Sequence, residues 1–294
     1  MKKESKKAKK NRNIELIAPL EGELLSTLRS LLCEKMPAGK IKSLLEHRAV
    51  SVNGRVSTAF DLPVSAKDVI KVSLSHAGDP PPFEILYEDE SLIAINKPSG
   101  LLSVATDREK DVTAFRILRE SGREVYTVHR LDRDTSGVLI FAKSRETRDI
   151  MQENWDERVI KRGYIAVCEG VFEKKSGVIE SSLAETSTHI MYSTKQGGKK
   201  AVTEYTVVRE NDRYSLLDIR ILTGRKNQIR AHMKECGHPV AGDKKYGASA
   251  DPLRRLALHA AELTFIHPVS GERITVKSEP PFDLPRTGKK RPER

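Results

Sequence analysis

The stretch HRLDRDTSGVLIFA, residues 129–142, joins a dense polar segment to an apolar run. Val138 to Ala142 predicts a buried strand, and the segment before it, His129 to Gly137, contains two carboxylates and three cationic or titratable groups. Polar residues at the mouth of a buried strand are a common catalytic arrangement, because the strand holds the loop rigidly. The stretch therefore predicts an element of the core with a candidate active site beside it. A salt-bridged turn is the alternative interpretation.

Strand patterns flank this segment on both sides along the chain. They cover Phe83 to Leu86, Leu92 to Ile95, Tyr164 to Val167, Thr203 to Val208 and Tyr214 to Leu222, and helical patterns cover Arg145 to Arg158 and Gln228 to Cys236. Strands outnumber helices, and several neighbouring strands are joined by short turns. These features predict an α+β domain over residues 83–284, with a mixed, largely antiparallel sheet and flanking helices.

The N-terminal part of the chain predicts a second, smaller α/β unit over residues 14–75. Its patterns are two helices, a strand, a hairpin turn and a closing strand, at residues 23–34, 40–47, 49–52, 53–54 and 69–72. The three prolines of residues 76–82 then predict an extended linker between the two units.

The net charge of the 294-residue chain is concentrated at its ends. The total is +11, of which residues 1–12 carry +6 and residues 285–294 carry +4. We therefore expect basic tails at 1–13 and 285–294, which attract polyanions through charge alone. A nucleic-acid function has to rest on a site in the folded part.

Several classes of protein are excluded by simple patterns. No apolar run approaches the ~18–20 residues that cross a bilayer, and the basic start is not followed by the apolar core of a secretory signal. The three cysteines form no CxxC pair, which argues against a zinc ribbon or a disulfide framework. We expect a cytoplasmic protein, a monomer, without contact to a membrane.

Other chemistries for the polar segment are weaker. Asp132 and Asp134 are two residues apart in extended chain, so they point to opposite sides and do not flank one bond as a glycosidase pair would. Ser136 and His129 lack the GxSxG elbow of a hydrolase, and no histidine spacing resembles HExxH, so we expect no metal site. Flanking arginines are expected to keep the carboxylate of Asp132 ionised.

Two further segments are rich in polar groups. TGRKNQIRAH, residues 223–232, follows a strand and opens a helix, where basic side chains and backbone N–H groups make an anion site that includes Arg225. A capped helix with solvated arginines is the alternative. GHPVAGDKKYG, residues 237–247, is rich in turn residues and is too ordered in residue type for a linker.

These three segments, in this order, resemble the RluA-type family of RNA pseudouridine synthases. LYEDESLIAINKPSGLLSV (86–104), KRGYIAV (161–167) and LHAAELTFIHPVSGE (258–272) extend the resemblance over nearly all of 83–284. HRLDRDTSG fits the family pattern HRLDxxTSG, whereas Asn227 stands where the family usually has histidine. The N-terminal unit resembles an S4-like RNA-binding module, a usual companion of this domain.

The resemblance implies an enzyme that isomerises uridine in RNA to pseudouridine without a cofactor or metal. It makes Asp132 the catalytic aspartate, acting either as a nucleophile at the anomeric carbon or as a base that generates a glycal. Arg230 matches the basic partner of that aspartate, and Tyr164 matches the active-site tyrosine that stacks on the target base. Arg130 matches the residue that fills the place of the extruded base.

The resemblance also implies which contacts select the RNA. In S4-like modules, basic side chains of the helix pair and the hairpin face the phosphate backbone; here these are Lys40, Lys42, Arg48 and Arg55. Such a module favours a large structured substrate, so we expect ribosomal RNA of the large subunit. A synthase acting on tRNA, and a non-catalytic RNA-binding or ribosome-assembly protein, are the alternatives.

Overall fold

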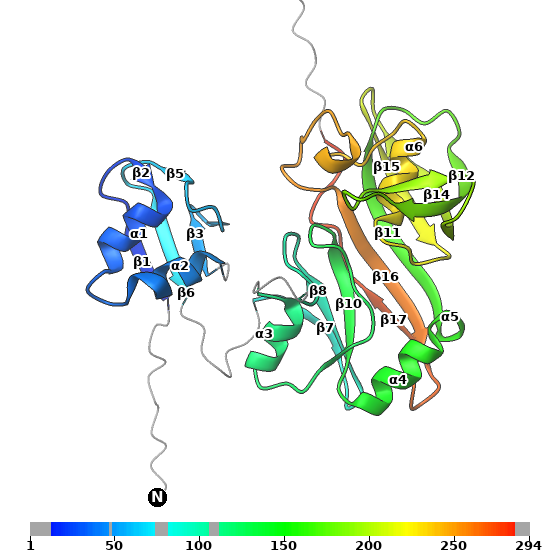
Figure 1. The fold of residues 1–294 in the computed structure, drawn as a ribbon, viewed down its shortest axis with the longest axis horizontal. Coiled ribbons are helices and arrows are strands. Elements are labelled where there is room, and N and C mark those ends of the chain that lie inside the picture. The colour runs from blue at the N-terminus through cyan, green and yellow to red at the C-terminus, as the bar shows by residue number, and fades with distance from the viewer. Residues whose placement is uncertain (1–12, 47–48, 74–81, 106–111, 286–294) are drawn as a thin grey trace, which may run out of the picture. The chain divides into compact units, whose positions relative to one another are not determined.

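The computed structural model describes residues 13–46, 49–73, 82–105 and 112–285. The predicted tails and linker lie almost wholly outside these ranges. The chain divides into two compact units, one made mainly of residues up to Pro80 and the other mainly of residues from Pro81 onward. Figure 1 labels their helices and strands, and each unit is described by itself.

The smaller unit combines an antiparallel sheet with a pair of helices. Its strands follow the order β1-β6-β3-β4, and a short pair, β2 and β5, lies beside them. The bounds are β1 (Asn13–Ile17), β2 (Gly22–Glu23), α1 (Leu24–Leu32), α2 (Ala38–Glu46), β3 (Val50–Val52), β4 (Arg55–Val56), β5 (Pro63–Val64) and β6 (Val69–Ser73). The leucine spacing buries one face of α1 through Leu24, Leu28 and Leu32, as the pattern predicts. This unit therefore has its own apolar core.

The predicted Asn53-Gly54 hairpin joins β3 to β4. Both residues have positive φ, 49° and 80°, as a two-residue turn with the twist of a hairpin requires. The Asn53 side chain accepts a hydrogen bond from the Val69 backbone N–H (2.9 Å) and donates one to Asp68 (2.8 Å). These bonds fix the turn to β6, so that Arg55 directly follows a rigid corner.

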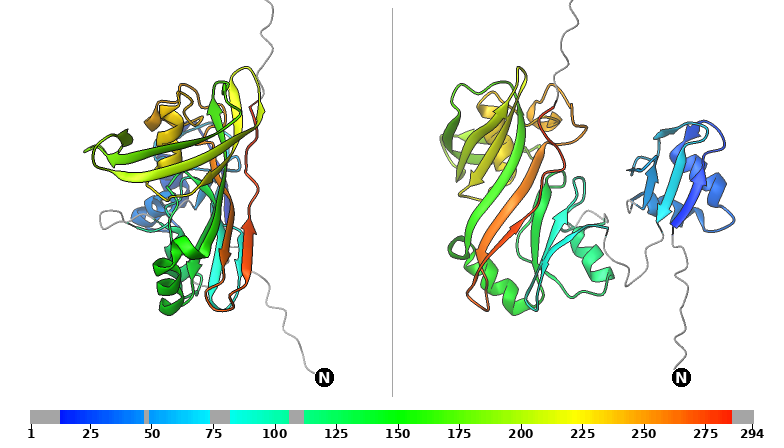
Figure 2. Two further views of the ribbon diagram at one scale, coloured as in Figure 1. Left: turned by 90° about the vertical axis from the view of Figure 1, so that its right-hand side faces the viewer. Right: turned by 180° about the vertical axis from the view of Figure 1, so that it is seen from behind.

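The larger unit is built on one large sheet in the order β13-β12-β14-β15-β11-β16-β10-β8-β7, with β17 beside β16 and β9 beside β10. Its strands are β7 (Ile85–Glu88), β8 (Leu92–Lys97), β9 (Tyr126–Thr127), β10 (Ser136–Ala142), β11 (Val159–Glu169), β12 (Ser176–Glu185), β13 (Met191–Thr194), β14 (Lys199–Glu210), β15 (Tyr214–Ile221), β16 (Leu258–Ile266) and β17 (Arg273–Lys277). Strand β10 pairs with β16 in parallel and with β8 antiparallel. The predicted mixed, largely antiparallel α+β sheet is confirmed. Figure 2 shows β12 and β14 turning away from the long strands β11 and β16.

The helices of this unit flank the sheet. They are α3 (Ala114–Glu120), α4 (Arg145–Glu153), α5 (Trp155–Arg158), α6 (Gln228–Glu235) and the 3₁₀ turn η1 (Lys244–Tyr246). The prediction of one helix over 145–158 is wrong, because Asn154 leaves the helical region at φ −110° and its side chain binds the Ile150 carbonyl (2.9 Å). The break turns the chain just before Trp155.

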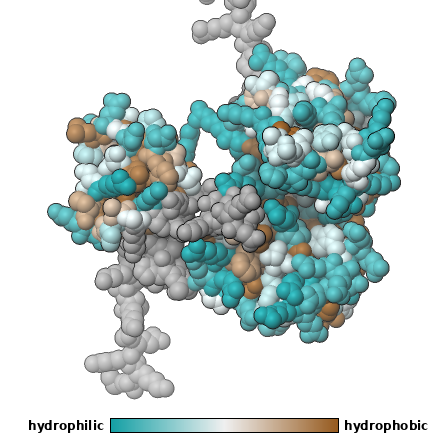
Figure 3. Space-filling model, in the orientation of Figure 1, coloured by the Kyte–Doolittle hydropathy of each residue, from teal (hydrophilic) through white to brown (hydrophobic). Residues whose placement is uncertain are grey.

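Strand β10 lies within the sheet, between β16 and β8, and all of its residues are buried. The polar segment 129–135 directly precedes it, so the candidate site lies next to the buried N-terminal end of this strand. The face shown in Figure 3 is mostly hydrophilic, with hydrophobic residues scattered over it. Among the described residues, no helix is both long and apolar enough to cross a membrane.

Candidate active site

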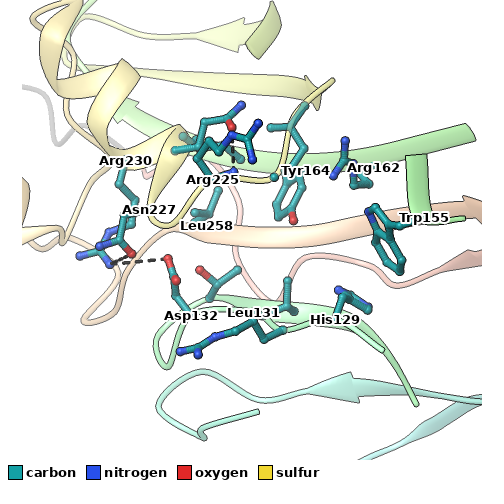
Figure 4. Close-up of a pocket in the computed structure, with 16 residues that line it drawn as sticks. His129, Leu131, Asp132, Trp155, Arg162, Tyr164, Arg225, Asn227, Arg230 and Leu258 are labelled. Carbon is teal, nitrogen blue, oxygen red and sulfur yellow. Dashed lines mark hydrogen bonds and ion pairs between the residues drawn. The ribbon is translucent and has the colours of Figure 1, made fainter. Parts of the chain in front are cut away.

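A cavity of about 260 Å³ lies in the larger unit, beside the loop that precedes β10. Its walls come from this loop, from α5, from β11, from the turn that opens α6 and from β16 (Figure 4). The lining includes Asp132, Arg130, Tyr164, Arg225 and Arg230. The structure therefore brings together the residues that three separate motifs predicted.

Buried hydrogen bonds hold the loop that carries Asp132. The Ser103 hydroxyl donates to the Leu131 carbonyl (2.9 Å) and accepts from its N–H (3.0 Å). The fully buried ammonium of Lys97 donates to the carbonyls of Arg133 (3.0 Å) and Leu101 (2.7 Å). Because backbone atoms on both sides of Asp132 are fixed, its carboxylate has little freedom to move. Neither Ser103 nor Lys97 was predicted from the sequence, since neither belongs to a motif with an expected role.

His129 supports the same loop from the other end of the cavity. Burial, together with the charge of Arg162, lowers the pKa of His129 to about 3, so the imidazole is neutral at neutral pH. Its Nε2 accepts a hydrogen bond from the Ile140 backbone N–H (3.1 Å), and its ring lies against that of Trp155, 4.9 Å between centroids. His129 thus ties the loop to β10.

The carboxylate of Asp132 faces the guanidinium of Arg230. The distance from Oδ2 to Nη1 is 3.8 Å, and the Asp132 side chain keeps 28% of its surface exposed. Burial raises the pKa of Asp132 above its ordinary value, and the nearby charges of Arg230, Arg130 and Lys97 oppose this only in part. A carboxylate made more basic is a better base and nucleophile once deprotonated.

Arg230 has a stronger partner than the one that the motif implied. Its Nε and Nη2 donate to both oxygens of Asp243, at 2.6 and 2.7 Å, and the Asp243 side chain is 1% exposed. Its guanidinium also lies over the ring of Tyr246, 4.8 Å from the centroid. Burial alone would lower the pKa of Arg230, but Asp243 and Asp132 raise it. The arginine is therefore always charged, and Asp243 directs its remaining N–H groups toward the cavity.

Asn227, at the start of α6, completes this arrangement. It has φ 49°, a left-handed conformation that asparagine tolerates better than most residues. Its Oδ1 accepts from Nη1 of Arg230 (3.2 Å), and its Nδ2 donates to the Tyr246 hydroxyl (3.1 Å). Position 227, where this chain departs from the usual histidine, thus lies in the cavity wall and orients Arg230.

Substitutions at Asn227 are expected to separate its two roles. Asn227→Ala loses both hydrogen bonds and keeps a Cβ in the left-handed region without the polar side chain that lets asparagine tolerate it, which we expect to lower the free energy of unfolding by about 2–3 kcal/mol. Asn227→Gly loses the same bonds without the backbone strain and should be more stable than the alanine variant by about 1 kcal/mol. Urea denaturation measures both values. Equal stability of the two variants would contradict the assigned conformation.

Tyr164 points its hydroxyl into the cavity from β11 (Figure 4). Burial raises the pKa of Tyr164 to about 12, with the charge of Asp132 adding to this and that of Arg162 opposing it. The phenol is therefore protonated at neutral pH and can donate a hydrogen bond. Arg162, which sequence reasoning did not select, lines the same wall and donates to the Leu222 carbonyl (2.7 Å).

The other predicted RNA-binding residues fall into two groups. Arg130 and Arg225 are exposed at the cavity, and Nε of Arg225 donates to the Lys200 carbonyl (2.9 Å). Lys42 and Arg55 are exposed in the smaller unit, where the Lys42 ammonium lies 5.3 Å from the Phe60 ring centroid. Arg48 and the side chain of Lys40 lie outside the described residues.

The chemistry of this cavity is that of an organic acid–base site. It combines a held carboxylate, a permanent cation and a protonated phenol around a space for one small group. Within the described ranges, no three His, Cys, Asp or Glu side chains are placed to hold a metal ion.

Known proteins are similar to this chain in sequence and in fold. The model of the family described as RNA pseudouridylate synthase matches residues 91–235. The chain is 32% identical to ribosomal large subunit pseudouridine synthase D of Nitrosomonas europaea, over 92% of this chain and 86% of that protein. It is 36% identical to tRNA pseudouridine synthase C of Pectobacterium carotovorum, over 70% of this chain and 60% of that protein. The solved structure of human RNA pseudouridylate synthase domain containing 1 superposes with a TM-score of 0.59 at 27% identity, over 71% of this chain and 87% of that one.

Proposed function

Because the chain belongs to the family of RNA pseudouridine synthases, we propose that it modifies large-subunit ribosomal RNA, with Asp132 as its catalytic carboxylate. The protein is an isomerase. The N1–C1′ bond of a uridine breaks and a C5–C1′ bond forms, while C5 loses a proton and N1 gains one. Because atoms and electrons balance within the uridine, this reaction requires no oxidant, reductant or nucleotide.

The position of Asp132 is the observation that carries the assignment of the catalytic residue. Its carboxylate lies in the wall of the cavity, on a loop fixed at both ends, 3.8 Å from the charged Arg230. It either attacks C1′ or removes the proton whose loss gives a glycal, and both routes need a deprotonated, oriented carboxylate. Arg230 stabilises that form, and Asp243 keeps Arg230 in place.

Tyr164 and Arg130 then act on the target nucleotide. The Tyr164 ring stacks on the base, and its protonated hydroxyl donates a hydrogen bond to the base as the glycosidic bond breaks. Arg130 is exposed beside the cavity, where its planar guanidinium fills the stack that the extruded base has left. Replacing the stacking of the lost base offsets part of the few kcal/mol that extrusion costs.

The smaller unit acts as an S4-like module that selects the RNA. A helix pair packs on its sheet, and Arg55 follows the rigid Asn53-Gly54 turn with its side chain exposed. Lys42 is exposed on α2. Exposed basic side chains at these two positions can contact phosphates, and Lys40 and Arg48 belong to the same proposed surface by their position in the sequence.

Ribosomal RNA is favoured over tRNA by the extent of the two similarities. The part of this chain left unmatched by the ribosomal large subunit synthase is much shorter than the smaller unit, so that similarity extends into this unit. The similarity to the tRNA synthase leaves enough of the chain unmatched to omit this unit entirely. The shared extra unit therefore supports a large-subunit substrate.

Pseudouridine maps of total RNA test the substrate. We expect cells that lack this protein to lose pseudouridine at one or a few uridines of large-subunit ribosomal RNA, with restoration by the wild-type gene but not by the Asp132→Asn gene. If pseudouridine were lost only from tRNA, the substrate would be tRNA and the proposal of ribosomal RNA would be wrong.

Removing residues 1–78 is expected to separate selection from catalysis. The larger unit has its own buried core. The truncated enzyme should therefore lose at least tenfold in kcat/KM on a long ribosomal fragment but only a few-fold on a short RNA with the same uridine. Removing residues 1–12 serves as the control, because it should weaken binding mainly at low salt and leave the modified uridine unchanged. Equal losses on long and short RNA would show that the module stabilises the enzyme instead.

A further inference from the structure

A second cavity adjoins the first on the other side of Arg230. It has a volume of about 400 Å³, within the size range of small-ligand clefts, and its lining includes Arg230 and Asp243. Arg230 lines both cavities, so the two spaces have one side chain in common. Whatever occupies the second cavity therefore lies beside the nucleotide that occupies the first.

The charge of this second cavity is positive. Lys244, Lys245, Arg254 and Arg255 line it together with Arg230, against the carboxylates of Asp134, Asp243 and Asp251. Two of these carboxylates already have partners within the protein. Asp243 binds Arg230 through both oxygens, and Asp251 accepts a hydrogen bond from the Arg255 backbone N–H (2.8 Å). An excess of positive charge is left for a ligand, because five cationic side chains line the cavity with three carboxylates.

Two of the cations are available. Among the described residues, the side chains of Lys244 and Arg254 have no hydrogen-bond or ion-pair partner, and both are exposed. In contrast, Lys245 donates to the His189 carbonyl (2.9 Å), and Arg255 donates to the Ser136 hydroxyl (2.6 Å). The first pair can turn to an anion without breaking a bond in the protein.

Buried contacts hold the backbone that carries these cations. Lys244 opens η1, whose first turn is closed by the Asp243 side chain accepting from the Tyr246 N–H (3.2 Å), and Tyr246 is fully buried. A Cβ on Gly242 would lie 2.1 Å from the Arg255 carbonyl oxygen, so these two segments touch backbone to backbone. Arg254 itself is held at φ 53°. The backbone of the site is thus in place before a ligand arrives.

We propose that this cavity binds a phosphodiester of the RNA strand next to the nucleotide extruded into the catalytic cavity, with Lys244 and Arg254 as its ligands. The proposal rests on the enzyme's action on RNA but not on which RNA is the natural substrate. An anion here also stands close to Arg230 and Asp243, so strand binding and the catalytic site share one wall. This contact places the ribose of the target against Asp132.

The test combines charge removal on the enzyme with charge removal on the RNA. The substrate is a short RNA that the wild-type enzyme has been shown to modify, synthesised in versions with one neutral methylphosphonate linkage at each position around the target uridine. The variants are Lys244→Gln with Arg254→Gln, and Lys174→Gln as a control, since Lys174 is exposed and lines neither cavity.

The double variant should raise KM about tenfold or more on the unmodified RNA, with a change in kcat of less than about threefold. One methylphosphonate linkage adjacent to the target should weaken the wild type by a similar factor and should not weaken the double variant further. The control should respond to every linkage as the wild type does. Additive losses at every linkage, or a loss in kcat with KM unchanged, would overturn the proposal.

Discussion

Replacing Asp132 by asparagine is expected to lower the rate of pseudouridine formation by a factor of about 10³ or more, with little change in RNA affinity. Asparagine keeps the size of the side chain but has no oxygen lone pair basic enough to attack carbon or take up a proton. Single-turnover assays with saturating RNA measure the rate, and filter binding measures the affinity. Asp134→Asn is the matched control for the rate at saturating RNA, because Asp134 is exposed and lines the second cavity but not the one that contains Asp132.

The pKa of Asp132 gives this prediction a pH dependence with a defined sign. Because burial raises the pKa of Asp132 in the folded protein, the wild-type rate should fall on the acid side at a pH above the ordinary aspartate value of about 3.9. A raised pKa also means that folding is favoured by protonation, so the ionised carboxylate costs stability above the folded-state pKa. Asp132→Asn should therefore melt at the same or a higher temperature than the wild type at pH 7, and the difference should vanish below about pH 4. An active Asp132 variant beside an inactive Asp134 variant would refute the assignment.

The largest loss of stability is expected from Asp243→Asn. This change leaves Arg230 charged and 9% exposed without its bidentate partner. Removing one member of a buried ion pair costs about 3–5 kcal/mol. For a unit of this size the melting temperature should fall by roughly 10 °C, measured by calorimetry, and activity should be lost well below that temperature because Arg230 is no longer oriented.

A second variant distinguishes unpaired charge from general damage. Adding Arg230→Met to Asp243→Asn removes the uncompensated charge and should recover part of the stability, since an apolar group of similar length tolerates burial. Activity should stay absent in the double variant. If Asp243→Asn were as stable as the wild type, the bidentate pair would not exist in solution.

Local pattern predicted those parts of the fold in which one face of an element is buried. The leucines of α1 and the apolar run of β10 have clear periodicity because one side, or both, packs into a core. Strand β12 gave no such signal, since most of its residues are exposed or half-buried on both faces. Its position is set by long ladders to β14 and β13, which a single sequence does not reveal.

The site shows the same division. The resemblance of the motifs predicted that Asp132, Tyr164 and Arg230 act in one site, and the structure brings them to one cavity. The motifs did not predict that Asp243 accepts two hydrogen bonds from the guanidinium of Arg230. The segment GHPVAGDKKYG was singled out only because it is rich in turn residues. That contact depends on η1 folding back under α6 and on the buried ring of Tyr246, which are tertiary arrangements. The sequence also did not reveal that the pKa of Asp132 is raised, because flanking charges are visible in a sequence, whereas burial is not.

The parallel pairing of β10 with β16 has a consequence for how the enzyme comes into existence. Ser136 and Gly137, which follow the loop that carries Asp132, pair with His259 and Ala260, and the Ser136 hydroxyl lies 2.8 Å from the His259 ring nitrogen. The ribosome must add more than a hundred residues between these partners. Closing so long a loop is slow, because its entropy is lost before the contact forms. A nascent chain that already contains Asp132, Tyr164 and Arg230 therefore still lacks β16, the strand that pairs with β10 directly after the loop. The order of synthesis thus delays activity until the C-terminal strands have joined the sheet.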